Sequence, residues 1–117
     1  MGKDPSAAKD HRHAARSWSK LPGAAELEKA SAMFRALGDP ARLRLLARLA
    51  GSEVCVTELA DSENEKLTTV SARLRTLHEA RLVKRRREAK HIYYAPLDKH
   101  VLQLVQSAIE HAAESND

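Results

Sequence analysis

The stretch LTTVSARLRTLHEARLVKRRREAKHIYYA, residues 67–95, decides the fold. In its first half, apolar residues recur at helical spacing, which predicts an amphipathic helix over about residues 67–80 with one buried stripe: Val70, Leu74 and Leu77. In its second half the period changes, and the segments 82–87 and 91–95 contain residues that favour strands. Two such segments joined by Glu88-Ala89-Lys90 predict a β-hairpin.

Helical patterns continue on both sides of this stretch. Upstream, they predict helices over residues 24–37, 40–50 and 56–61, with a polar turn over 62–65. Asp39 is suited to the N-cap position and Pro40 to the first helical position of the second of these helices. Downstream, Asp98 can cap a last helix that runs to about Ala113.

A helix, a short turn, a helix with an exposed polar face and a basic hairpin together predict a winged helix-turn-helix. The expected fold class is therefore mainly α with a small β-hairpin, dimerising through its terminal helices. We expect residues 1–23 to be a flexible arm, because they contain Pro, Gly and Ser without an apolar period, and residues 24–117 to be the folded domain.

Composition narrows the function. The chain has 117 residues, of which 31% are charged and 43% hydrophobic, as expected of one small folded domain. No apolar run approaches the roughly 20 residues that span a bilayer, so we expect a cytoplasmic protein without a membrane partner. The single cysteine, Cys55, excludes an internal disulfide framework. Aromatic residues make up only 3%, too few for a platform that stacks single-stranded nucleic acid.

Positive charge is concentrated in the stretch that decides the fold. The net charge of the chain is +4, whereas residues 66–91 hold nine basic and two acidic residues, a local charge of +7. Such a block is typical of a protein that binds the phosphate backbone of double-stranded DNA. The predicted major-groove contacts lie on the second helix of the motif: Thr68, Thr69, Ser71, Arg73 and Arg75. The predicted phosphate contacts lie on the hairpin: Arg85, Arg86, Arg87, Lys90 and His91.

Four residues that commonly bind metal ions stand at the two ends of the last predicted helix: Asp98, His100, His111 and Glu114. The two histidines are eleven positions apart, which separates them by about 16 Å along a helix axis. One ion cannot bridge that gap within one chain. By contrast, His111 and Glu114 are neighbours at i and i+3, and Asp98 can turn toward His100 at the helix start.

Two antiparallel copies of this helix would complete the site. The Asp98 and His100 end of one copy would meet the His111 and Glu114 end of the other, and a two-fold axis would generate two identical four-ligand sites. Leu104, Val105 and Ala108 lie between the ends, where the two helices are expected to touch. Two imidazoles and two carboxylates suit tetrahedral Zn²⁺, with Co²⁺ a possible substitute. Four protein ligands leave no position for a reactive water, so we do not expect an enzyme.

At this point the chain resembles the ArsR/SmtB family of metal-responsive winged-helix repressors. The similarity lies in LGDPARLRLL at residues 37–46, in EVCVTEL at 53–59, in the segments 69–74 and 79–83, and in the pattern Asp-x-His-x10-His-x-x-Glu at 98–114. The last pattern is similar to the inter-subunit site of the family's zinc-sensing branch.

The resemblance implies a mechanism. A metal-free homodimer would bind an inverted-repeat operator as a repressor, and zinc at the inter-subunit site would release it, so that genes for metal efflux or sequestration are transcribed. The resemblance also suggests a second metal site made of Cys55, Glu58, His11 and His13. Thr57 replaces a family thiolate, which argues against a sensor of soft metals. An alternative is a repressor of the same family that senses cobalt, nickel or a redox signal at Cys55.

Overall fold

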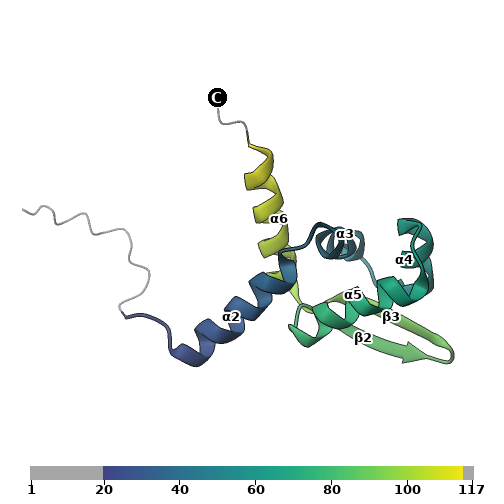
Figure 1. Ribbon diagram of the computed structural model, residues 1–117, viewed down its shortest axis with the longest axis horizontal. Coiled ribbons are helices and arrows are strands. Elements are labelled where there is room, and N and C mark those ends of the chain that lie inside the picture. Colours follow the sequence, from purple (N-terminus) through teal and green to yellow (C-terminus); the bar gives the residue numbers. More distant parts are fainter. Residues whose placement is uncertain (1–19, 115–117) are drawn as a thin grey trace, which may run out of the picture.

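Residues 20–114 are described by the computed structural model, and they form five helices and one three-stranded antiparallel sheet (Figure 1). The helices are α2 (Ala24–Leu37), α3 (Pro40–Leu49), α4 (Val56–Glu63), α5 (Leu67–Glu79) and α6 (Lys99–Ala113). The strands are β1 (Val54–Cys55), β2 (Val83–Glu88) and β3 (His91–Pro96). This architecture confirms the predicted fold class. None of the helices in this part of the chain is long and apolar enough to cross a bilayer.

The predicted helix starts are confirmed where a side chain caps the backbone. The Asp39 carboxylate accepts a hydrogen bond from the backbone N–H of Arg42 at 3.0 Å, and Pro40 follows as the first residue of α3. The Asp98 carboxylate accepts one from the backbone N–H of Val101 at 3.2 Å at the start of α6. Most of the predicted arm, residues 1–19, lies outside the described residues.

The turn between α4 and α5 is shorter than predicted. Ser62 and Glu63 belong to α4, and only the residues from Asn64 onward form the turn. Asn64 adopts the left-handed conformation, with φ 55° and ψ 47°, and its backbone N–H donates to carbonyls of the last turn of α4. Asparagine tolerates this conformation better than most residues, so it ends α4 and redirects the chain into α5.

The sheet has the order β1-β3-β2, and β1 is a strand that the sequence did not predict. Its two residues pair with the second strand of the hairpin, Val54 with Tyr94 and Cys55 with Tyr93. Two residues are too few for an alternating pattern, and this strand exists only because β3 offers a free edge. The β2–β3 hairpin is the wing of the winged helix-turn-helix. Glu88 pairs with His91, which leaves a two-residue tip in which Ala89 has φ 56°.

The core confirms the predicted face of α5, because Val70, Leu74 and Leu77 are fully buried. Helix α6 contributes Val101 and Val105 to the same core. The expectation that Val105 faces a partner helix is therefore wrong, since this side chain is 6% exposed within one chain. From residue 106 to residue 114, every residue of α6 and its C-cap is exposed, and Figure 1 shows this end of the helix projecting from the rest of the fold.

An ion-pair cluster joins α3 to α4. The Glu63 carboxylate accepts hydrogen bonds from Arg44 Nε, at 2.8 Å, and from Arg48 Nε. Its side chain is only 7% exposed. The hydrogen bond from Arg44, reinforced by the one from Arg48, lowers the pKa of Glu63 from 4.5 to about 2. The ionised carboxylate is thus favoured in the folded state.

We predict that Glu63→Gln lowers the free energy of unfolding by about 1–2 kcal/mol at pH 7, the usual effect of losing charge-assisted hydrogen bonds. Because the folded pKa is depressed, the wild-type contribution is fully present above pH 4.5 and is lost as the pH falls toward 2. The deficit of the variant should therefore shrink between pH 5 and pH 3.5 in urea titrations. Glu58→Gln, an exposed position on the same helix, is the control. A deficit independent of pH would contradict this assignment.

Candidate functional site

The predicted DNA-contacting residues of α5 lie on its outer faces. Thr68 and Arg75 are exposed, while Thr69, Ser71 and Arg73 are half-buried. Arg73 is partly engaged, because its guanidinium lies 3.5 Å from the carboxylate of Glu65 in the preceding turn. Helix α5 has no side-chain cap and no acidic residue in its first turn, so its N-terminus is compatible with an approaching phosphate.

Basic side chains also line the wing. Figure 1 shows α5 and the wing adjacent to each other, which brings the charge of both elements to one region of the molecule. Four of the predicted wing contacts are exposed and, within residues 20–114, form no ion pair: Arg85, Arg87, Lys90 and His91.

Arg86 differs from its neighbours. Its Nε and Nη2 donate to the two carboxylate oxygens of Glu53, at 3.0 and 2.7 Å, and its Nη1 donates to Glu88 at 2.6 Å. Its guanidinium also lies 4.7 Å from the centre of the Tyr93 ring. The hydrogen bond from Arg86 lowers the pKa of Glu53. Sequence analysis missed this role of Glu53, since 33 positions separate it from Arg86 and no local pattern connects them.

The four predicted metal ligands form two separate pairs at the two ends of α6. Asp98 Oδ2 lies 3.6 Å from His100 Nδ1, and Glu114 Oε1 lies 3.6 Å from His111 Nδ1. Both imidazoles are almost fully exposed, His100 at 90% and His111 at 85%. No group of three or more His, Cys, Asp or Glu side chains within residues 20–114 is placed to hold a metal ion. Each end therefore brings together two potential donors.

The spacing within each pair fits a shared ion. Two donors bound to one tetrahedral zinc at about 2.0–2.1 Å lie about 3.4 Å apart. The observed 3.6 Å is close to that value. Asp98 has an extended backbone, with φ −163°; one of its carboxylate oxygens caps Val101 and the other lies near His100, as expected.

The second predicted metal site is not assembled among the described residues. Cys55 is buried, and its Sγ lies 3.7 Å from His91 Nδ1 on the wing. Glu58 is exposed on α4. His11 and His13 lie outside the described residues, so this site stays a prediction.

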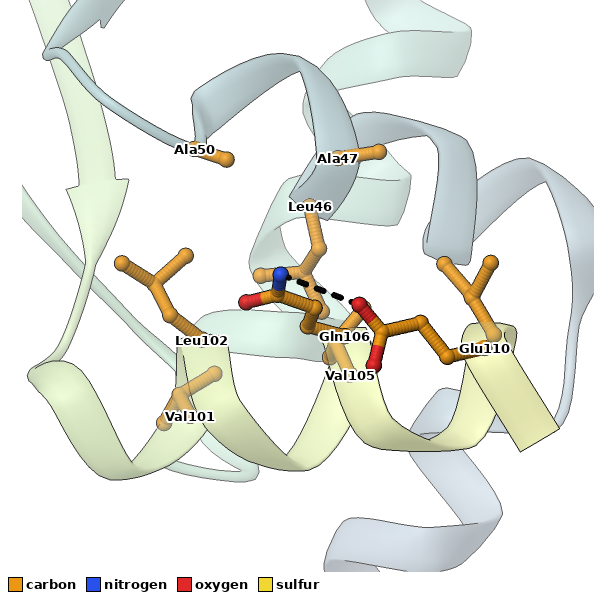
Figure 2. Close-up of a pocket in the computed structure, with 9 residues that line it drawn as sticks. Leu46, Ala47, Ala50, Val101, Leu102, Val105, Gln106 and Glu110 are labelled. Atoms are coloured by element: carbon orange, nitrogen blue, oxygen red, sulfur yellow. Dashed lines mark hydrogen bonds between the residues drawn. The ribbon is translucent and has the colours of Figure 1, made fainter.

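An apolar groove of about 420 Å³ lies between α3 and α6 (Figure 2). Ala47 of α3 and Ala50, the C-cap residue of α3, line it on one side, while Leu102 and Val105 line it from α6. Gln106 and Glu110 border it and are joined by a hydrogen bond of 3.2 Å. The exposed Ile109 also lines the groove.

Comparison with known proteins identifies the same architecture. A family described as a helix-turn-helix domain matches residues 37–86. The transcriptional repressor SmtB homolog of Synechocystis sp. is 41% identical over 98 residues, which cover 81% of this chain and 74% of that protein. The cadmium resistance transcriptional regulatory protein CadC homolog of Staphylococcus aureus is 36% identical over 83 residues, which cover 70% of this chain and 69% of that protein.

A solved structure agrees with these relatives. The solution structure of a homodimeric winged helix-turn-helix DNA-binding domain from Mycobacterium bovis, described as a possible ArsR-family regulator, superposes with a TM-score of 0.77. It is 30% identical, and the match covers 87% of this chain and 94% of that one. The identity and coverage of the Synechocystis and M. bovis relatives show that the chain belongs to the ArsR/SmtB family of winged-helix DNA-binding transcriptional regulators. It is therefore a regulator rather than an enzyme.

Proposed function

We propose that this protein is a metal-responsive repressor whose homodimer binds an inverted-repeat operator and dissociates from it when zinc occupies two sites between the subunits. The observation that carries the proposal is the presence of one donor pair at each end of α6, with the two atoms of each pair 3.6 Å apart.

The DNA-binding part of the proposal rests on α5 and the wing. Helix α5 enters the major groove with Thr68 and Arg75 foremost, and Thr69, Ser71 and Arg73 beside them. On the wing, Arg85, Arg87, Lys90 and His91 contact phosphates, which supplies affinity and salt dependence rather than sequence choice.

The dimer covers apolar surface that one chain leaves exposed. Leu27 and Phe34 on α2 are 52% and 61% exposed, and Ile109 on α6 is 45% exposed beside the groove. Large apolar side chains at this exposure are typical of an interface. The homodimeric state of the relative from M. bovis supports a second copy of this chain as the partner.

The metal-binding part rests on the donor chemistry. In an antiparallel pair of α6 helices, Asp98 and His100 of one protomer face His111 and Glu114 of its partner. A Zn²⁺ ion held there would be bound by four ligands, two from each protomer, and would link the ends of the two helices. Nitrogen and oxygen donors favour zinc or cobalt over cadmium and other soft metals, which prefer thiolates. By linkage, zinc weakens operator binding by the same factor as the operator weakens zinc binding.

The first prediction concerns α5. With a duplex selected by the wild-type protein from a random pool, Arg75→Gln should lower affinity by about 10- to 100-fold, as expected for one lost base contact of about 1–3 kcal/mol. Affinity for an unrelated duplex should fall much less. Arg35→Gln on α2 makes the same charge change outside the proposed DNA-contacting elements, α5 and the wing, and is the control. An equal loss on both duplexes in fluorescence anisotropy would contradict base reading by Arg75.

The second prediction tests whether the ligands come from two subunits. Homodimers of His100→Gln or of His111→Gln should lose tight zinc binding, because every site lacks one ligand. A mixed dimer with one protomer of each variant should regain one metal site. In that site, the intact His100 of one protomer faces the intact His111 of the other. Differently tagged subunits and zinc analysis of the purified mixed dimer measure this. A mixed dimer with no recovered site would disprove the antiparallel arrangement.

The third prediction concerns release. Zinc should raise the operator Kd of the wild type by about 5- to 150-fold, the usual range of allosteric coupling. Glu114→Gln should abolish this effect and leave metal-free binding intact. Glu110→Gln, one turn earlier on the same helix, should behave like the wild type. Equal release of all three proteins in a zinc titration would locate the sensor elsewhere.

A further inference from the structure

The contact between Glu53 and Arg86 spans the whole sheet. Glu53 directly precedes β1 and Arg86 lies on β2, yet these strands are not neighbours, because β3 lies between them. The Arg86 side chain crosses above Tyr93 of β3, its register partner, to reach the carboxylate. Both carboxylate oxygens are engaged, at 2.7 and 3.0 Å, which gives the planar fork geometry available to arginine and not to lysine.

The hydrophobic core holds the wing through Val83, Tyr94 and Ile92, but few polar contacts fix it against the body. Within residues 20–114, the Glu53–Arg86 pair is the one ion pair that connects the wing to another part of the fold. Strand β1 adds only two residue pairs, and Cys55 adds one contact to His91 at 3.7 Å. A two-stranded hairpin is marginally stable by itself in water, so the angle of the wing depends on these polar anchors as well as on its packing against the core.

The same contacts occupy the charge of Arg86. Two carboxylates, from Glu53 and Glu88, surround its guanidinium, whereas Arg85 and Arg87 form no ion pair in this part of the chain. A phosphate approaching Arg86 would have to displace both acids. The central arginine of the triplet is thus chemically distinct from its two neighbours.

We propose that Glu53 and Arg86 are positioning residues, which hold the wing at the angle at which Arg85 and Arg87 reach the phosphate backbone, and that Arg86 itself is not a phosphate ligand. This inference rests on the proposed contact between the wing and DNA.

The two interpretations of Glu53 predict opposite changes in DNA affinity for the Glu53→Gln variant. If charge alone mattered, Glu53→Gln would tighten DNA binding, because it removes a negative charge near the duplex and frees Arg86. If Glu53 positions the wing, Glu53→Gln weakens binding, and we expect a loss of about 5- to 20-fold at 0.15 M salt. Exposed ion pairs contribute little to global stability, so the melting temperature should change little. Amide exchange of the wing should accelerate.

Charge-conserving variants provide the matched comparison. Arg86→Lys keeps the charge but loses the fork, so it should bind DNA nearly as weakly as Arg86→Gln. Arg87 is the proposed phosphate-contacting position next to Arg86, so Arg87→Lys should retain most of the DNA affinity. Arg87→Gln should lose that affinity, and the slope of log K against log salt concentration should fall by about one unit. The double variant Glu53→Gln/Arg86→Gln should bind no more weakly than Arg86→Gln alone, because both changes break one contact.

Affinity of Glu53→Gln equal to or above that of the wild type, or full affinity of Arg86→Lys, would overturn the positioning role. A separate outcome tests the function on which it rests: if Arg85→Gln and Arg87→Gln both bind duplex DNA like the wild type, the wing does not contact DNA. Anisotropy titrations of all variants at a temperature where each is folded by circular dichroism decide between these results.

Discussion

The burial of one face of α5 is the constraint on which the arrangement of the DNA interface depends. Val70, Leu74 and Leu77 are fully buried, and this fixes the rotation of the helix about its own axis. Because the apolar stripe faces the core, Thr68 and Arg75 face solvent. The same core includes Leu82 and Val83, at the base of the wing, so α5 and the wing are positioned by one packing unit.

A second constraint is the length of α6. A straight helix of 15 residues keeps its ends about 20 Å apart, so the donor pairs at its two ends cannot serve one ion. The first half of the helix packs into the core of its own chain through Val101 and Val105, while the second half is exposed. The start of this helix thus belongs to the fold of its own chain, while its end is available to a partner.

The sequence predicted the features that depend on local patterns. Helix starts were correct at Asp39 and Asp98, because a capping carboxylate acts within three residues of its own position. The strand β1 was missed, since it is defined by the edge of β3 rather than by its own two residues. The assignment of Val105 to the dimer interface was wrong, because helical periodicity shows that a face is apolar without showing what covers it. The difference between Arg86 and its neighbours also required the fold, since its partner lies 33 positions away.

The exposed second half of α6 has a consequence for the unassembled subunit. Residues 106–114 contact little of their own chain, and so short a helical segment is marginal in water without tertiary support. We therefore expect the end that carries His111 and Glu114 to fray and to be cut by proteases more readily in a solitary protomer than in a dimer that covers it.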